Sequence, residues 1–476
     1  MMDSRARWLA LYVLCLGDLM IVLDGTIVNV ALPTIRDDLG FSETSLAWVV
    51  NAYLLTFGGF LLLGGRLGDL YGHRRLFLTG IGVFTAASLG CGLSTSQELL
   101  VSMRAVQGLG GALVAAVALS LVMTLFTETA ERAKAMGIFG FVLSGGGVAG
   151  VLAGGILTDL LSWHWIFLVN IPVGVLVFVL SLRLLPATKG IATGRLDIGG
   201  AVTITAALML AVYAIVNGND NGWTSALTLG LLGAAVVLLG LFGAIEARIA
   251  APLVPLSVFR NRSVSTSNVI GGLMAAGLFA YFFFSALYMQ QVLDYSPLEV
   301  GLAYLPGTIL WGASSLYSDN LVMRFGIKPP LLAGLGLMIV SLLLFARVPV
   351  DGSWAIDILP ATLAVSLGAG IAFNPILLAA MGGVGPEQAG LASGVVNTSF
   401  MMGGALGLAV LAALADSRTS SLTDSGTDRV AALNGGYHAA FLLGAAFLVT
   451  AGVIVATLLR ATTAPQPHGE PAAETA

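Results

Sequence analysis

Charged residues are scarce in this chain. Only 10% of its 476 residues are Asp, Glu, Lys or Arg, whereas 57% are hydrophobic. Soluble domains carry about 25% charged residues, so the composition excludes an ordinary soluble protein and favours a membrane protein. The net charge of −4 says little, because the distribution of cations along a membrane protein matters more than their sum.

Cysteine and histidine are scarce as well. Cys15 and Cys91 both fall inside apolar runs, which argues against a disulfide framework. The four histidines fall in predicted loops, at the first residues of predicted spans or in the tail, without metal-ligand spacing. There is also no basic tract with interleaved aromatic residues, so we expect no nucleic-acid partner. We predict no metal, no cofactor and no enzymatic activity.

Long apolar runs fill most of the sequence. About twenty residues suffice to cross the hydrocarbon as a helix. The first run follows Arg5 and Arg7, and it is too long for a signal peptide. We predict an all-α integral membrane protein with fourteen spans, at 8–32, 46–67, 76–95, 99–125, 134–158, 163–185, 197–217, 225–246, 264–292, 299–322, 330–348, 355–380, 388–414 and 436–459.

The segments between the spans alternate in charge. Those on one side carry Arg and Lys, as in Arg74 and Arg75 or Arg324 and Lys328, whereas those on the other side are acidic or neutral. Cationic segments stay in the cytoplasm. We therefore expect an even number of spans, with both termini cytoplasmic. The segment 415–436 is the one sizeable exterior loop in this prediction.

A faint internal repeat relates the two halves of the chain. Residues 131–137 resemble 387–393, and 65–75 more loosely resemble 315–328. Both pairs align when the first six spans are matched to the last six, with spans seven and eight inserted between. Two repeated helical bundles around a cavity are typical of secondary transporters. The predicted parts are an amino-terminal bundle (1–187), two inserted helices (188–262), a carboxy-terminal bundle (263–460) and a disordered cytoplasmic tail (461–476).

An acidic and a basic side chain lie inside two of the predicted spans. Asp24 is in the first and Arg104 in the fourth. A charge deep in a bilayer is costly, so it usually faces a partner or a cavity and has a function. At about 1.5 Å per residue the two lie roughly 13 Å and 9 Å from the same end of their spans, which makes contact feasible. Either Asp24 carries a proton under the control of Arg104, or the two form a permanent ion pair.

Asp18 is a second acid in the first span. It lies six residues before Asp24, so on an ideal helix the two carboxylates point about 120° apart and do not share a proton. Asp18 is a candidate to line a cavity, to attract a cationic substrate or to form a second proton site. An ordinary hydrogen-bonded structural role is the alternative.

The segment 65–75 is the strongest local pattern. Its glycines permit close approach of helices, and its arginines hold the loop in the cytoplasm. Asp69 suits the positive end of a nearby helix, and the start of span thirteen near Gln388 is its natural partner. A breakable latch between the two halves and a simple topology anchor are both compatible with the pattern. The predicted gating residues here are Gly65, Asp69, Gly72, Arg74 and Arg75.

The fifth span has glycine at about every fourth residue. Such glycines share one face of a helix and let a neighbouring helix pack closely. Packing and a flexible kink are the two interpretations. The glycines concerned are Gly146, Gly150, Gly154 and Gly155.

Other polar and aromatic residues inside the spans are candidates for a substrate cavity. Polar side chains in spans also join helices by hydrogen bonds, and aromatic ones also face lipid, so each has a structural alternative. The candidates are Asn29, Asn51, Gln107, Tyr281, Phe284, Tyr288, Gln291, Asn374 and Asn397.

Together these motifs resemble the major facilitator superfamily, in particular its fourteen-helix drug:proton antiporter branch. The resemblance covers nearly the whole chain and rests on 23–33, 65–75, Arg104 with Gln107 and Gly108, 137–155, and 162–172. Val151 stands where the pattern of the fifth helix has proline. The resemblance implies two six-helix bundles plus two inserted helices, and it associates the Arg104 motif with proton coupling.

The resemblance also implies a function. We expect an exporter of hydrophobic or cationic toxic compounds, antibiotics among them, that works by alternating access in the bacterial inner membrane. The proton gradient would supply the energy, and the chain would act as a monomer within the lipid bilayer. A proton-coupled importer of a small metabolite is the alternative.

Overall fold

The described part of the chain is almost entirely helical. The computed structural model describes residues 4–126, 128–186, 197–249, 252–381, 384 and 386–459, and these contain no strand. The first helices are α1 (Ser4–Leu39), α2 (Glu43–Tyr71), α3 (His73–Gly92), α4 (Gln97–Leu125), α5 (Thr129–Leu160), α6 (Trp165–Leu168) and α7 (Asn170–Leu184). The inserted segment contains α8 (Ile198–Val216), α9 (Gly218–Asn221), α10 (Ala226–Arg248) and the 3-10 helix η1 (Leu256–Arg260).

The last part of the chain repeats the helical pattern. Its elements are α11 (Arg262–Gln291), α12 (Pro297–Phe325), α13 (Lys328–Phe345), the π-helix η2 (Trp354–Ile358), α14 (Leu359–Met381), α15 (Pro386–Asp424) and α16 (Arg429–Leu458). The all-α class is confirmed. The predicted tail 461–476 and the first domain boundary at 187–188 lie outside the described residues, and the division into domains stays a prediction.

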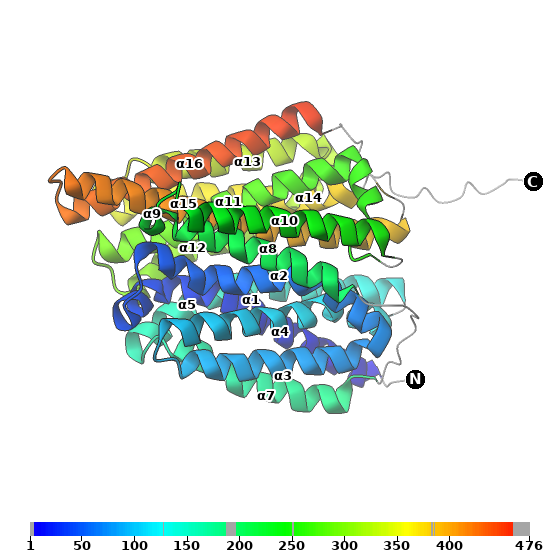
Figure 1. Cartoon of the computed structure of the whole chain (residues 1–476). Coiled ribbons are helices and arrows are strands. Elements are labelled where there is room, and N and C mark those ends of the chain that lie inside the picture. The colour runs from blue at the N-terminus through cyan, green and yellow to red at the C-terminus, as the bar shows by residue number, and fades with distance from the viewer. Residues whose placement is uncertain are drawn as a thin grey trace, which may run out of the picture.

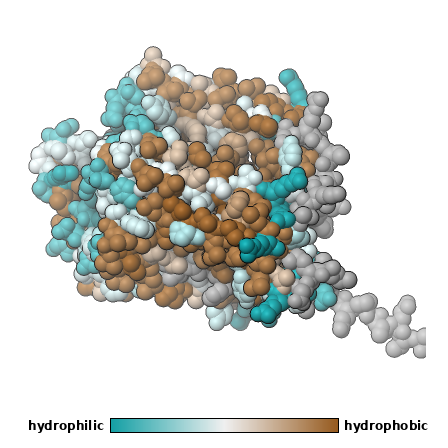
Figure 2. Space-filling model, turned by 90° about the horizontal axis from the view of Figure 1, so that it is seen from below, coloured by the Kyte–Doolittle hydropathy of each residue, from teal (hydrophilic) through white to brown (hydrophobic). Residues whose placement is uncertain are grey.

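The helices have the length and surface of membrane spans. Twelve helices in the described part are long and apolar enough to cross a membrane. α5 and α12 are 32 and 29 residues long but do not meet the same measure, so the count of fourteen stays a prediction. Figure 2 shows a broad hydrophobic band with hydrophilic residues gathered towards both ends. A lipid-facing surface of this kind is expected of a multi-pass membrane protein.

Several predicted helix ends differ from the structure. The segment 415–436 is not a loop, because α15 continues to Asp424 and α16 begins at Arg429. The two helices project as a hairpin beyond the bundle (Figure 1). α1 continues through Pro33 to Leu39, and the span predicted at 163–185 is divided into α6 and α7. Hydropathy finds the membrane-crossing part of a helix and misses its polar extension.

The helices form two groups that meet along shared seams. α1 packs against α5 and α7, and α4 packs against α2 and α3. In the second half, α11 packs against α15 and α16, and α14 packs against α12 and α13. Between the groups, α2 contacts α15 and α5 contacts α12. The start of α1 and the end of α16 lie on the same side of the bundle, which we call the terminal face (Figure 1).

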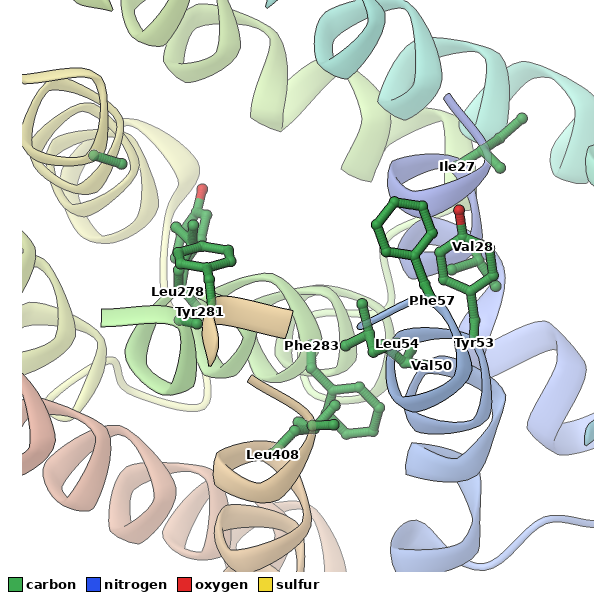
Figure 3. Close-up of a cluster of buried hydrophobic side chains, with 14 of the residues drawn as sticks. Ile27, Val28, Val50, Tyr53, Leu54, Phe57, Leu278, Tyr281, Phe283 and Leu408 are labelled. Atoms are coloured by element: carbon green, nitrogen blue, oxygen red, sulfur yellow. The ribbon is translucent and has the colours of Figure 1, made fainter. Parts of the chain in front are cut away.

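Apolar side chains fill the space between the two groups. Leu54 on α2 and Phe283 on α11 point towards each other across it, with Leu408 on α15 beside them (Figure 3). All three are buried. Dispersion and burial of such side chains hold the two groups together in this conformation.

The inserted helices lie outside this seam. α8 packs against both α2 and α15, and α10 packs on α8. α10 buries few of its residues, and Leu227, Val236 and Val237 are among its exposed apolar side chains. α10 therefore presents its apolar surface to lipid, while α8 covers the junction of the two halves.

Candidate functional site

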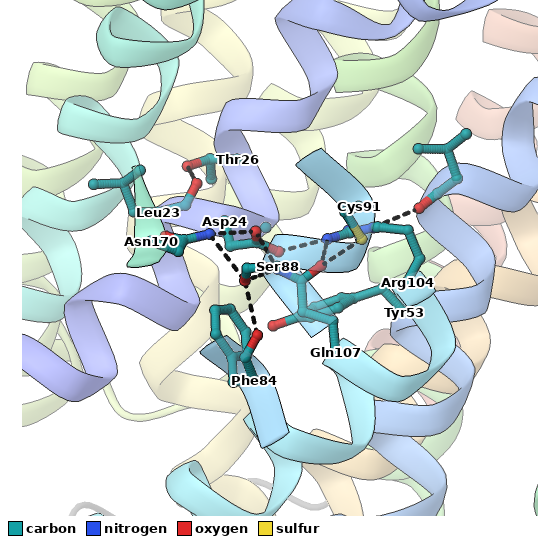
Figure 4. Close-up of polar contacts among 12 residues, drawn as sticks. Leu23, Asp24, Thr26, Tyr53, Phe84, Ser88, Cys91, Arg104, Gln107 and Asn170 are labelled. Carbon is teal, nitrogen blue, oxygen red and sulfur yellow. Dashed lines mark hydrogen bonds and ion pairs between the residues drawn. The ribbon is translucent and has the colours of Figure 1, made fainter. Parts of the chain in front are cut away.

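Asp24 is sealed inside the amino-terminal group of helices. Its side chain is 0% exposed. Oδ1 accepts hydrogen bonds from Gln107 Nε2 at 2.7 Å and from Asn170 Nδ2 at 3.0 Å. Oδ2 accepts from Arg104 Nη1 at 2.5 Å. Three donors on two other helices, α4 and α7, thus converge on one carboxylate of α1 (Figure 4).

Arg104 makes further contacts that hold it in place. It is 1% exposed. Its Nε donates to the carbonyl of Val49 at 2.9 Å, and its Nη1 also donates to Gln107 Oε1 at 2.8 Å. The guanidinium lies 4.4 Å from the ring centroid of Tyr53, within cation–π range. The arginine therefore connects α4 to α1 and α2.

A hydroxyl and a thiol complete the network. Ser88 Oγ on α3 accepts from Gln107 Nε2 at 2.8 Å and donates to the carbonyl of Phe84 at 2.8 Å. Cys91 Sγ lies 3.7 Å from Gln107 Oε1. The network thus includes side chains from α1, α2, α3, α4 and α7, and we call it the Asp24 network.

The charges of the Asp24 network balance. One carboxylate faces one guanidinium, and both are surrounded by fixed hydrogen-bond partners, which is the arrangement that offsets the desolvation of a buried pair. Removing or adding one proton unbalances it. The geometry brings the two predicted residues together and is compatible with both predicted roles, the proton carrier and the permanent ion pair.

Asp18 does not belong to the Asp24 network. It is 5% exposed, and no hydrogen bond or ion pair to its carboxylate occurs in the described part of the chain. The structural alternative, a hydrogen-bonded Asp18, is therefore not seen here, and its role as a second proton site stays a prediction.

The predicted gating segment forms the turn between α2 and α3. Gly72 has φ of +96°, a region that favours glycine, and its N–H donates to the carbonyl of Gly68 at 2.9 Å. Asp69 lies 3.4 Å from His73 Nε2 within the same turn. Arg74 donates to the carbonyl of Leu182 on α7.

The predicted latch, a contact between Asp69 and the start of span thirteen in the other half, stays a prediction. The side chain of Gln388, its predicted partner, lies outside the described residues. Gly65 has open space around it, and Arg75 is exposed. The contacts that are described hold this turn to its own half of the molecule.

The glycines of α5 lie against two neighbouring helices. A Cβ on Gly146 would meet Leu19 and Val22 of α1, and one on Gly154 would come within 2.6 Å of the carbonyl of Ile27. Gly155 faces α12 instead, with the carbonyl of Pro297 2.7 Å from its Cβ position. These contacts agree with the packing interpretation of the glycines. As for the kink, the helix α5 is continuous from Thr129 to Leu160.

We expect Gly150→Ala to destabilise the protein by about 1–3 kcal/mol, the usual cost of overpacking. The new Cβ would lie 2.0 Å from Thr26 Oγ1 and 2.9 Å from the carbonyl of Leu23. Gly230→Ala on α10 is the matched control, because nothing lies within 4 Å of its Cβ position. Thermal unfolding in detergent would measure both. Equal stability of the two variants would contradict the close packing of α1 on α5.

The predicted substrate residues are scattered over the fold. Tyr281 and Phe284 are buried among rings of the carboxy-terminal group, including Phe345 and Phe441. Three other candidates donate hydrogen bonds: Tyr288 to the carbonyl of Pro349, Asn29 to carbonyls within α1, and Asn374 to Asp319. Gln107 belongs to the Asp24 network. The buried amide of Asn51 has no partner in the described chain, and Asn397 is half-buried on α15.

One cavity lies between the two halves at the face opposite the terminal face. It measures about 450 Å³ and is lined by the end of α1, the end of α11 and the start of α16. Arg36, Asp37, Asp294 and Arg429 make its lining strongly polar. Gln291 is the predicted substrate residue that lines it, and its Oε1 accepts from Tyr437. The space is of the size that small ligands occupy.

Comparison with known sequences identifies the family. The sequence profile described as Major Facilitator Superfamily matches residues 14–408, well over half of the chain. The chain belongs to the Major Facilitator Superfamily. This membership confirms the resemblance predicted from the motifs and makes the protein a transporter rather than an enzyme.

Several relatives in the superfamily carry names that refer to drug resistance or export. The chain is 40% identical to "Puromycin resistance protein pur8" of Streptomyces alboniger, over 96% of this chain and 91% of that one. It is 39% identical to "Cephamycin export protein CmcT" of Amycolatopsis lactamdurans, over 86% and 85%. It is also 35% identical to "Multidrug resistance protein Stp" of Mycobacterium tuberculosis, over 86% and 76%.

Solved structures of transporters share the fold. An auto-inhibited peptide transporter of the POT family superposes with a TM-score of 0.70 at 14% identity, covering 98% of this chain and 99% of that one. A bacterial homologue of the lysosomal transporter Spinster gives 0.67 at 16% identity, covering 95% and 97%. At these identities the likeness concerns the fold alone, which is that of the Major Facilitator Superfamily.

Four members of the Asp24 network, namely Tyr53, Ser88, Cys91 and Asn170, were not predicted as site residues. Each of them lies in an apolar span. Asn170 carried a signal, since it is a polar residue in a membrane span of a superfamily transporter. Ser88 and Cys91 carried little, because small residues of this kind are common in packed membrane helices.

Proposed function

We propose that this protein exports small hydrophobic or cationic compounds, antibiotics among them, from a bacterial cell in exchange for protons. The observation that carries the proposal is its 40% identity, over 96% of the chain, to a puromycin resistance protein. The relatives named for cephamycin export and multidrug resistance support the same direction of transport. Import of a metabolite has no such support.

Proton coupling rests on the Asp24 network. A proton that binds Asp24 removes its charge and leaves the guanidinium of Arg104 buried without a counter-charge, which is unfavourable in a low dielectric. Arg104 would then shift towards its other acceptors, Gln107 and the carbonyl of Val49. Because these groups belong to different helices, protonation and helix position become linked. Asp18 is the candidate for a second proton site.

The remaining parts of the proposal concern placement. The protein would lie in the bacterial cytoplasmic membrane as a monomer, with the terminal face towards the cytoplasm, as the cationic segments predict. The polar cavity at the opposite face would then be the exterior vestibule. Alternating access would rock the two groups of helices about the seams α2–α15 and α5–α12.

The direct test is accumulation of substrate in cells that lack their own efflux pumps. Cells that express this protein should hold less puromycin than cells with the empty vector, and a protonophore should remove the difference. A panel of dyes and antibiotics would define the range of substrates. Greater accumulation upon expression would indicate an importer and would overturn the proposal.

A further inference from the structure

A second pair of buried acids lies far from the Asp24 network. Asp197 is the residue before α8, and Glu246 is in the last turn of α10, so both lie at the terminal face. They are 2% and 3% exposed. Transport by the Asp24 network makes no use of them, and burying two carboxylates is costly.

Each acid uses one oxygen in an ordinary hydrogen bond. Asp197 Oδ1 accepts from the N–H of Gly200 at 2.7 Å and so caps α8. Glu246 Oε2 accepts from the N–H of Val254 at 3.1 Å. The second bond fastens the end of α10 to the connection that leads to η1 and α11.

The two remaining oxygens face the same small space. Asp197 Oδ2 and Glu246 Oε1 are both buried without a hydrogen-bond partner. They lie 2.4 Å and 2.9 Å from the point where a Cβ on Gly200 would be. Gly200 leaves room for both, and any side chain there would displace one of them.

No cation neutralises the pair in the described part of the chain. The charged side chains at this end of the elements packed around it are Arg66 and Asp69 on α2, Arg248 on α10 and Arg260 in η1. All four are exposed, and none forms a described ion pair with either acid. The side chain of Glu387 on α15, and Lys189 and Arg195 in the segment before Asp197, lie outside the described residues.

We propose that Asp197 and Glu246 share a single proton and that this acid pair is a pH-sensitive lock on the connection between α10 and α11. Two adjacent buried carboxylates cannot both be ionised, so the second keeps its proton. The protonated oxygen becomes a donor to the ionised one, which satisfies both unpartnered oxygens at once. The proton is taken from solution on folding, and no other group need change.

The lock bears on the junction of the two halves. Leu253 and Val254, next to the bond from Glu246, pack in one cluster with Leu63 on α2, Ala201 on α8 and Val395 on α15. Loss of the shared proton would place two negative charges side by side beneath this cluster. The connection would separate from α10, and the α2–α15 seam would loosen at the terminal face.

The first test is the pH dependence of unfolding in detergent. The folded state holds one proton that the unfolded state does not hold at neutral pH, so stability falls as pH rises, with an unfolding constant that increases about tenfold per pH unit. Glu246→Gln replaces the shared proton by an amide and should remove the contribution of the pair to this dependence. Asp197→Asn, which can still cap α8, should do the same. Asp351→Asn, an exposed acid, is the matched control and should behave as the wild type.

Two further measurements keep the proposal falsifiable if one variant folds poorly. Infrared spectra of the wild type should show a protonated carboxyl band at neutral pH that weakens in Glu246→Gln. The rate at which a thiol reagent labels Leu253→Cys should increase at alkaline pH. The increase should be larger than in the double variant Leu253→Cys/Glu246→Gln, which serves as the control for ionisation of the thiol itself. Identical pH profiles with and without Glu246→Gln, or stability that follows sodium concentration instead of pH, would overturn the proposal. None of these readouts depends on transport.

Discussion

Asp24→Asn is expected to reduce substrate-driven proton movement to the background of vesicles without the protein. Asparagine keeps the shape of the side chain and an Oδ1 that accepts from Gln107 and Asn170, but it cannot carry a proton in exchange. Everted membrane vesicles with a pH-sensitive dye would measure the proton movement when a substrate such as puromycin is added. The folded variant should still bind substrate, because the loss concerns coupling.

Matched variants make this result interpretable. Asp351→Asn removes an exposed acid from the loop between α13 and η2 and should leave proton movement unchanged. Asp18→Asn tests the other buried acid of α1 and should lower the number of protons moved if Asp18 is a second site. Normal proton-coupled export by Asp24→Asn would defeat the assignment and leave the Asp24–Arg104 pair with a purely structural role.

The pairing of Asp24 with Arg104 was accessible from the sequence for a physical reason. Two opposite charges in apolar spans, at compatible depths, have few ways to avoid isolation in a low dielectric. The rotation of each helix about its axis was not accessible. That rotation decides that Ser88 and Asn170 reach the Asp24 network, whereas Asp18, in the same helix as Asp24, has no partner among the described residues.

The acid pair of the inserted segment illustrates a second limit. Asp197 and Glu246 stand at the ends of apolar runs, where charged residues ordinarily mark the membrane surface. The sequence therefore gives no sign that these two acids are buried. Both acids are buried because the chain folds back over them after α10. In this segment the N–H of Val254 donates a hydrogen bond to Glu246. A contact made by tertiary packing leaves no periodic signal.

Tyr281 and Phe284 show the same limit for the substrate site. An aromatic run in an apolar span is compatible with a cavity wall, a lipid-facing surface or a packed core. The structure places both rings against α13 and α16 inside the carboxy-terminal group. Gln291, at the end of the same helix, lines the polar cavity instead. Position along the helix and its rotation, neither of which hydropathy reports, separate these cases.

Arg104→Gln is expected to cost about 3–5 kcal/mol of stability, the usual effect of removing one partner of a buried ion pair. Asp24 would be left charged or forced to take up a proton, and the carbonyl of Val49 would lose its donor. The double variant Asp24→Asn/Arg104→Gln should recover much of this loss, because no uncompensated charge remains. Arg75→Gln, which removes an exposed arginine, is the control and should change stability by less than about 0.5 kcal/mol.

The double-mutant cycle separates the energy of the pair from its function. Unfolding of all four proteins in detergent gives the interaction energy between the two side chains. A large interaction energy together with loss of coupling in every variant indicates an ion pair that is stable at rest and broken during transport. Additive losses in the cycle would mean that Arg104 acts through Gln107 and Val49 alone, and the charge of Asp24 would then need another counter-charge.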